Sequence, residues 1–296
     1  MDNWRTDLGP LAGLVTTATR DLCVDGSGRV WTDSGSGFRD TGAVLDAGAV
    51  RRIGVSLIDS AGGRVDDARP IGDAAFAGNV RAHLVLPPVA RDGPLLSLRF
   101  PQTDVVGLNR FACATGIDLA EIARRGTLIA GVTGSGKTTL ATAMLDALPD
   151  AQRVVIVEDL AEMNPLHPHT IHLTTRTANA DGGGAVGLAD LVRESLRMRP
   201  DSVVVGEIRG PEIREFLAAA TSGHHTVATI HAGSIEQVAA RVMTLALLAG
   251  VPRDVVAELA ESAIPRVTFC HRTERGFAVT TGRFVAERQR LRVVAD

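Results

Sequence analysis

The sequence lacks tyrosine altogether, has a single lysine and carries only three cysteines in 296 residues. The cysteines, Cys23, Cys113 and Cys270, are odd in number and far apart, so they predict neither a disulfide framework nor a C-x-x-C metal pair. No apolar run approaches the roughly 18 residues that a membrane-spanning helix requires. The first residues also lack the apolar core of a secretory signal, so we expect a chain that is neither exported nor inserted in a membrane.

Charge and aromatic content argue against one class of partner. The formal net charge is −3, and the aromatic residues are 8 Phe and 2 Trp. Proteins that track along nucleic acids use a basic channel and aromatic side chains that stack on bases. We therefore expect no nucleic-acid partner. The chain is long enough for two domains, each with its own core.

The first hundred residues predict a small α+β domain. Strands are expected at Leu22–Val24 and Arg29–Trp31, because the turn between them is rich in glycine and aspartate. The apolar pattern of Ala47–Ile58 predicts a helix, and Val80–Leu86 and Leu95–Phe100 predict two more strands. We place this domain at residues 1–100 and a linker at residues 101–107.

Residues 108–296 predict an α/β domain of the nucleotide-binding kind. A capping box at Ser234 and Gln237 is expected to open a helix that ends near Gly250. Short strands are expected near the end of the chain, with a turn at Thr281-Gly282. Four earlier runs are apolar on both faces, which is typical of strands in a parallel sheet covered by helices: Thr127–Ala130, Arg153–Val157, Ser202–Val205 and Thr226–Ile230.

The run Gly131–Thr138, GVTGSGKT, matches G-x-x-x-x-G-K-[ST] at every fixed position, between an apolar strand and a helix-forming run. Its glycines let backbone N–H groups surround phosphate oxygens, and the helix directs its positive end at the same anion. The only lysine, Lys137, is expected to bridge the β- and γ-phosphates, where a compact ammonium fits better than a guanidinium. Thr138 is expected to ligate Mg²⁺. The predicted ATP contacts are Gly131, Thr133, Gly134, Ser135, Gly136, Lys137, Thr138 and Thr139.

Two predicted strands end in carboxylates. Val154–Val157 runs into Glu158, and Val203–Gly206 runs into Glu207. Parallel strands place their carboxyl ends at one edge of the sheet, where the phosphate loop also lies. Hydrolysis requires a polarised water and a held magnesium ion, and both acids suit that work. In many nucleotide hydrolases, an Asp ends the apolar strand that corresponds to Val203–Gly206. Here Gly206 stands at that position, and Glu207 follows it.

The sequence resembles the secretion and type IV pilus traffic ATPases. The likeness is greatest to the tight-adherence (Flp) pilus assembly ATPases and the type IV secretion ATPases. All four blocks that carry the likeness occur in the expected order. They are the phosphate loop, the acidic box Ile156–Glu162, the run Leu196–Asp201 leading into Val205–Gly210, and the histidine box Thr221–Ala232. The N-terminal domain is similar more loosely.

The resemblance implies a homohexameric ring of two-domain subunits, with ATP between the N-terminal domain and a RecA-like P-loop domain. By position, Glu158 is the implied general base, and Glu207 organises Mg²⁺ and water. His224 and His231 are the implied sensors of the phosphate, or link it to a neighbouring segment.

Two N-terminal arginines, Arg81 and Arg99, match residues that reach the nucleotide phosphates in the family, and guanidinium groups bind phosphate in a bidentate manner. His225 is expected to be structural. His167, His169 and His172 lie in a loop that contains proline and has no cysteine partner, so we expect no zinc site there.

The implied function is a cytoplasmic motor, peripherally associated with the cytoplasmic membrane, that hydrolyses ATP to drive pilus assembly or protein secretion. Its implied partner is a polytopic platform protein of the inner membrane. Two alternatives stay open: a RecA-like nucleic-acid translocase, and a regulatory subunit that binds nucleotide without hydrolysing it.

Overall fold

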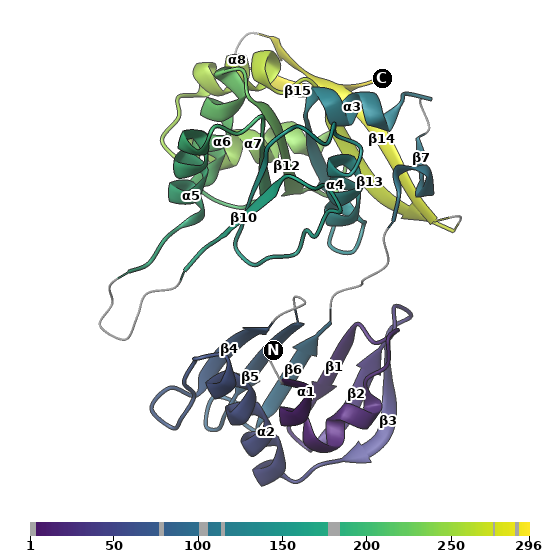
Figure 1. Cartoon of the computed structure of the whole chain (residues 1–296), viewed down its shortest axis with the longest axis vertical. Coiled ribbons are helices and arrows are strands. Elements are labelled where there is room, and N and C mark those ends of the chain that lie inside the picture. Colours follow the sequence, from purple (N-terminus) through teal and green to yellow (C-terminus); the bar gives the residue numbers. More distant parts are fainter. Residues whose placement is uncertain are drawn as a thin grey trace. The chain divides into compact units, whose positions relative to one another are not determined.

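The computed structural model of the chain describes residues 4–76, 80–100, 106–113, 116–176, 184–274, 276–287 and 290–296. The chain divides into two compact units, Met1–Asp104 and Val105–Asp296 (Figure 1). Within the described ranges, no helix is long and apolar enough to cross a membrane. Residues 101–105 of the predicted linker lie outside these ranges.

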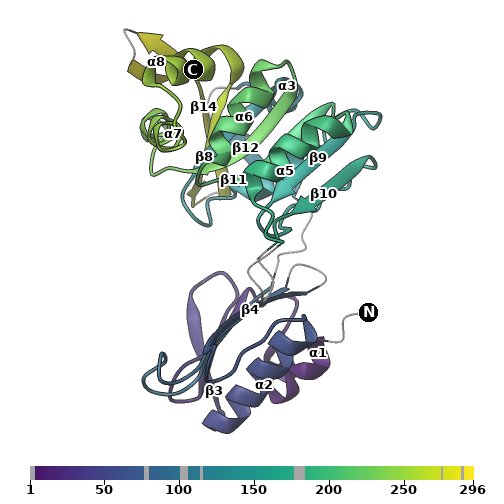
Figure 2. The ribbon, with the colours of Figure 1, turned by 90° about the vertical axis from the view of Figure 1, so that its left-hand side faces the viewer.

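The N-terminal unit is an antiparallel sheet with helices packed on one face (Figure 2). Its six strands follow the order β3-β2-β1-β6-β5-β4. The helices are α1 (Trp4–Asp7), the 3₁₀ helix η1 (Gly9–Leu14) and α2 (Ala47–Ser60). The strands are β1 (Asp21–Val24), β2 (Arg29–Asp33), β3 (Phe38–Val44), β4 (Ile71–Phe76), β5 (Val80–Val85) and β6 (Leu95–Arg99).

Alternating side chains build the core of this unit. In β5, Val80, Ala82 and Leu84 are buried while Arg81 and His83 between them are more exposed, and Leu57 of α2 packs in the same core. The Asp46 carboxylate accepts the N–H of Ala49 at 2.8 Å, which caps the start of α2. The predicted α+β domain is confirmed. Strand β3 was not predicted because it is largely exposed and lacks an apolar face.

The C-terminal unit is built on a mixed sheet in the order β10-β9-β11-β12-β8-β13-β14-β15, and β7 pairs with β14. The strands from β10 to β13 are parallel, and β14 and β15 are antiparallel additions. The strands are β7 (Phe111–Cys113), β8 (Thr127–Gly131), β9 (Val154–Glu158), β10 (Thr170–Thr174), β11 (Ser202–Ile208), β12 (His225–His231), β13 (Val267–Thr273), β14 (Gly276–Glu287) and β15 (Arg290–Ala295).

Helices cover both faces of this sheet, as the doubly apolar strands predict. Leu128 of β8 joins a core formed with α5, α6, α7 and α8, whereas the next residue, Ile129, joins a core formed with α3 and α4. Figure 2 shows α5 and α6 side by side on the first face. The helices are η2 (Leu108–Arg110), α3 (Leu119–Arg125), α4 (Lys137–Leu145), α5 (Leu188–Ser195), η3 (Leu196–Met198), α6 (Glu212–Thr221), α7 (Gln237–Leu248) and α8 (Arg253–Ala263).

Two local predictions in this unit are wrong. Ser234 makes no capping box: α7 begins at Gln237 after Glu236, and the Gln237 side chain accepts the N–H of Gly233 at 3.2 Å. Thr281-Gly282 forms no turn but lies inside β14, because pairing with β13 and β15 keeps both residues extended. Non-local pairing overrides the local turn preference of glycine at this point.

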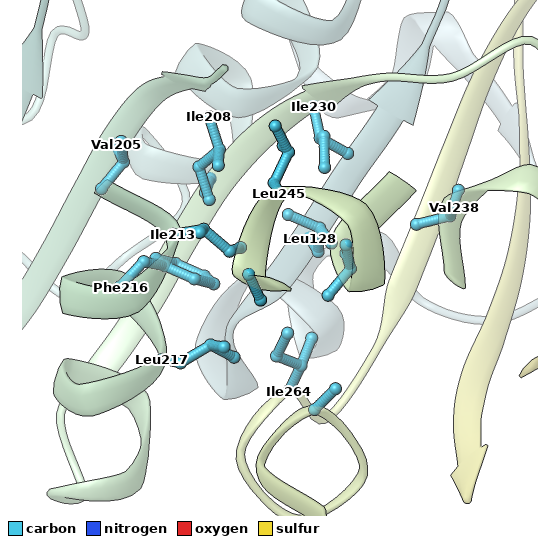
Figure 3. Close-up of a cluster of buried hydrophobic side chains, with 14 of the residues drawn as sticks. Leu128, Val205, Ile208, Ile213, Phe216, Leu217, Ile230, Val238, Leu245 and Ile264 are labelled. Carbon is cyan, nitrogen blue, oxygen red and sulfur yellow. The ribbon is translucent and has the colours of Figure 1, made fainter. Parts of the chain in front are cut away.

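Phe216 of α6 anchors the first core and is fully buried (Figure 3). We expect Phe216→Ala to lower the free energy of unfolding of the C-terminal unit by about 3–5 kcal/mol, because it removes apolar contacts and leaves a cavity. Denaturant titration measures this loss. Leu248→Ala is the control: Leu248 is 80% exposed, and its truncation should change stability by only about 0.5 kcal/mol. Equal losses in the two variants would contradict this assignment of the core.

Candidate functional site

The glycine-rich run connects β8 to α4 as a tight strand-to-helix loop. Gly136 has φ +97° and precedes the first residue of α4, so a larger residue would be strained there. A Cβ at Gly136 would also lie 2.7 Å from Cδ1 of Phe277. Ser135 is buried, and its hydroxyl has no hydrogen-bond partner among the described residues. A buried hydroxyl in this position fits a loop that binds oxygen atoms of a ligand.

Lys137 lies at the start of α4, with only 9% of its surface exposed. Its Nζ donates a hydrogen bond to the carbonyl of Val132 across the loop at 3.0 Å. Burial lowers the pKa of Lys137, while the Glu207 carboxylate acts in the opposite direction. The ammonium group is therefore held inside the loop, within electrostatic reach of an acidic strand end.

Glu158, the last residue of β9, is buried. Its Oε1 accepts the N–H groups of Glu162 and Met163, both at 3.0 Å. These bonds satisfy backbone donors in the segment that follows β9 and hold the carboxylate at the strand end.

Gly206 stands directly against this buried glutamate. A Cβ at Gly206 would lie 2.7 Å from Cγ of Glu158, closer than real contacts allow. The carbonyl of Gly206 accepts the hydroxyl of Thr229 at 2.6 Å, which ties β11 to β12. The departure from Asp at this position thus has a steric reason: any side chain here would force the Glu158 side chain to move.

We expect Gly206→Ala to displace the Glu158 side chain and to lower the free energy of unfolding by about 1–3 kcal/mol, as overpacking does. Denaturant titration measures the loss. Gly13→Ala is the matched control, because a Cβ at Gly13 meets no atom within 4 Å. If both variants were equally stable, the contact between Gly206 and Glu158 would not constrain the site.

Glu207, Arg209 and His231 line an open cavity of about 760 Å³ together with the exposed side of α7. Arg209 Nη2 donates to Glu207 Oε2 at 2.5 Å, and this hydrogen bond is the main cause of the raised pKa of Arg209. His231 ends β12 and is the register partner of Gly131. The predicted Glu207 and His231 therefore lie beside the phosphate loop.

Two charged residues of this cavity were missed from the sequence. Arg209 belongs to the run Val205–Gly210 that carries the family likeness. No role was predicted for it, although it follows Glu207 by two residues. Arg241 lies one helical turn after Gln237 on α7 and lines the same cavity. Spacing of i and i+4 along a helix was the available signal, because such residues share one face.

His224 is not brought to the phosphate loop. It precedes β12, and its Nδ1 bonds with the Ser222 hydroxyl at 2.9 Å. The strand places His224 at the opposite edge from His231, about 23 Å away at ~3.3 Å per residue. Within this unit His224 therefore lies away from the loop, and its role as a phosphate sensor or as a link to a neighbouring segment stays a prediction. His225 bonds Ser202 Oγ and the carbonyl of Ala123, as expected of a structural histidine.

Arg81 and Arg99 belong to the N-terminal unit, where they are register partners on β5 and β6. Arg99 Nε also bonds Asp21 Oδ1 at 2.9 Å. Like charges that face each other across two strands are unfavourable unless other charges compensate them. The sheet thus places the two arginines opposite each other on neighbouring strands.

The fold and the loop define a P-loop protein of the α/β class: a glycine-rich turn and a buried lysine lie at the carboxyl edge of a parallel sheet. The sequence pattern of the family described as "Type II/IV secretion system protein" matches residues 93–280. The chain belongs to this family. The predicted likeness to the secretion and pilus traffic proteins is thereby confirmed, whereas the narrower likeness to Flp pilus proteins stays a prediction.

Relatives and solved structures agree with this assignment. The chain is 43% identical over 265 residues to a Mycobacterium tuberculosis protein whose name assigns it to conjugal transfer, covering 84% of this chain and 75% of the relative. It is 28% identical to the type IV secretion system protein PtlH of Bordetella pertussis, covering 85% of each chain. The structure of the pilus retraction motor PilT has the same fold, with a TM-score of 0.65 and 17% identity over 90% of this chain and 78% of PilT. The RecA-like P-loop prediction is confirmed.

Proposed function

We propose that this chain hydrolyses ATP and is the motor subunit of a secretion or pilus system. One observation carries the proposal: the phosphate loop holds a buried Lys137 within electrostatic reach of Glu207, and His231 is the register partner of the first loop glycine. A triphosphate needs this combination of backbone donors, a fixed ammonium and a carboxylate at one sheet edge.

Each residue of the site has its own proposed role in ATP hydrolysis. Backbone N–H groups of the loop and Lys137 hold the phosphates, and the Thr138 hydroxyl with Glu207 would hold Mg²⁺. The metal supplies charge neutralisation at the transferred phosphate. Glu158 is the proposed general base, fixed at the end of β9 by its two backbone hydrogen bonds. His231 would sense the phosphate from the neighbouring strand.

Arg81 and Arg99 are proposed to contact the nucleotide phosphates. Their register pairing across β5 and β6 supports this role, because it places two arginine side chains on one face of the sheet and guanidinium groups bind phosphate oxygens. Arg99 keeps part of its charge balanced by Asp21.

The finer features of the motor also belong to the proposal. A homohexamer of two-domain subunits would act from the cytoplasmic side on a polytopic platform protein of the inner membrane. Membership of the family supports a role in secretion or pilus assembly. Among the relatives, the names that refer to conjugal transfer and type IV secretion support the secretion branch.

The deciding experiment is phosphate release by the purified full chain with and without Mg²⁺. We expect release that depends on both ATP and the metal. A chain that binds ATP but releases no phosphate would be a regulatory subunit, and release stimulated by single-stranded DNA would favour a nucleic-acid translocase.

A further inference from the structure

A second pocket, of about 400 Å³, opens at the amino ends of three parallel strands of the C-terminal unit. It is lined by Arg153, His169, Met198, Arg199 and Asp201. None of these residues takes part in the proposed nucleotide chemistry. Its volume lies at the small end of the ~300–1,000 Å³ that is common for small-molecule sites.

The parallel register explains how three of these residues meet. Arg153, His169 and Asp201 each stand one residue before a strand, namely β9, β10 and β11. The first residues of those strands are register partners. Glu158 ends β9 at the other edge of the sheet, about 16 Å away at ~3.3 Å per residue. The pocket is therefore separate from the phosphate loop.

Arg153 determines the hydrogen-bonding character of the pocket. Its Nε donates to the carbonyl of Met198 at 2.9 Å, and its Nη1 bonds with Nε2 of His169 at 3.0 Å. A guanidinium group can only donate, so Nε2 of His169 must accept. This bond holds the Arg153 guanidinium group and the His169 ring together in the lining of the pocket.

Arg199 adds an exposed guanidinium group. It has φ +55° and ψ +54°, and it is the one non-glycine residue with positive φ in the described part of the chain. It also precedes Pro200, and a residue before proline normally adopts an extended conformation. Within the described ranges the guanidinium group of Arg199 makes no hydrogen bond or ion pair. Such an unfavourable conformation persists where the surroundings impose it, and it is concentrated at functional sites.

Asp201 is the one carboxylate of the lining. Its Oδ2 already accepts the backbone N–H of Arg153 at 2.8 Å, so one of its oxygens is occupied. Two guanidinium groups outweigh this single negative charge. The pocket is therefore rich in donors and carries a net positive charge.

We propose that this pocket binds a phosphate-type oxyanion, either free phosphate or the phosphate of a lipid headgroup. Guanidinium groups match the paired oxygens of a phosphate, and Arg153 and Arg199 bring two of them to one pocket. The site is distinct from the phosphate loop in place and in residue type, because it uses arginine side chains rather than backbone N–H groups.

Arg199→Gly is the sharpest test, since glycine adopts φ +55° without strain and so only the guanidinium group is lost. Inorganic phosphate is titrated calorimetrically into full chains that carry Lys137→Ala, which weakens competing binding at the loop. We expect Arg199→Gly to weaken phosphate binding at least tenfold and Asp201→Asn to strengthen it severalfold. In chains that retain Lys137, we expect Arg199→Gly to lower the number of phosphate sites by one.

Arg197→Ala is the matched control, because this exposed arginine pairs with Glu194 and does not line the pocket. A parallel arm measures sedimentation with phosphatidylglycerol vesicles and with phosphatidylcholine vesicles. Loss of free-phosphate binding in Arg199→Gly identifies a soluble ligand, and loss of binding to the anionic vesicles alone identifies a headgroup. Unchanged binding in both arms, or equal losses in Arg197→Ala, would overturn the proposal.

Discussion

Lys137→Ala is expected to weaken ATP binding by about ten- to a hundredfold, because hydrogen bonds to charged groups contribute about 1.5–3 kcal/mol. The ammonium lies inside the loop and is buried, so no other lysine can replace it in a chain that has only one. Titration of the full chain with ATP, followed by calorimetry, measures the loss. Unchanged affinity would remove the loop from nucleotide binding.

Lys137→Arg tests whether ATP binding depends only on the positive charge at residue 137 or also on the compact shape of the ammonium group. It keeps the positive charge but replaces a compact ammonium, now bonded to the Val132 carbonyl, with a broad planar fork. We expect this variant to bind ATP at least tenfold more weakly than the native chain, while its thermal unfolding shows that the fold is intact. Native affinity in Lys137→Arg would mean that charge alone matters, and the argument from the single lysine would fail.

Glu207→Gln is expected to bind ATP with nearly native affinity but to release phosphate about a hundredfold more slowly or worse, since groups that position or polarise the attacking water contribute about 10²–10⁴-fold. The substitution keeps the size of the side chain and removes its charge. It also breaks the ion pair with Arg209, so a change in rate needs a control for ion-pair loss.

Glu215→Gln supplies that control. Glu215 of α6 also pairs with an arginine, Arg193, at 3.0 Å, and it does not line the cavity beside the phosphate loop. We expect near-native phosphate release from this variant. Native turnover in Glu207→Gln would take Glu207 out of the mechanism, and an equal slowing in Glu215→Gln would show that ion-pair loss is the cause.

Much of the C-terminal fold was predictable because its signals are local. The doubly apolar strands ending in Glu158 and Glu207 pointed to a covered parallel sheet with acids at one edge. Predictions failed where distant chain segments decide the conformation. Thr281-Gly282 is held extended by two neighbouring strands, and β10 was missed because its residues are half-exposed at the sheet edge.

The residues of the candidate site also fall into two groups: those that the sequence identified and those whose position only the structure decides. Residue type and spacing identified the loop, Glu207 and His231, and the structure places the last two beside the loop. His224 looked equivalent to His231 because the two are seven residues apart in one motif, yet that distance spans a whole strand and carries His224 to the other edge. The roles of the N-terminal arginines stay predictions.

The sequence by itself determined the phosphate loop, because eight adjacent residues contain all the chemistry that binding needs: glycines free to adopt positive φ, one lysine and the hydroxyl of Thr138. Tertiary structure alone decided which distant groups join it. Only the packed sheet presses Gly206 against Glu158, brings His231 beside Gly131, and gathers Arg153 and Arg199 into a second pocket at the opposite edge. Contacts between segments far apart in the chain depend on strand order and register, which no short motif encodes.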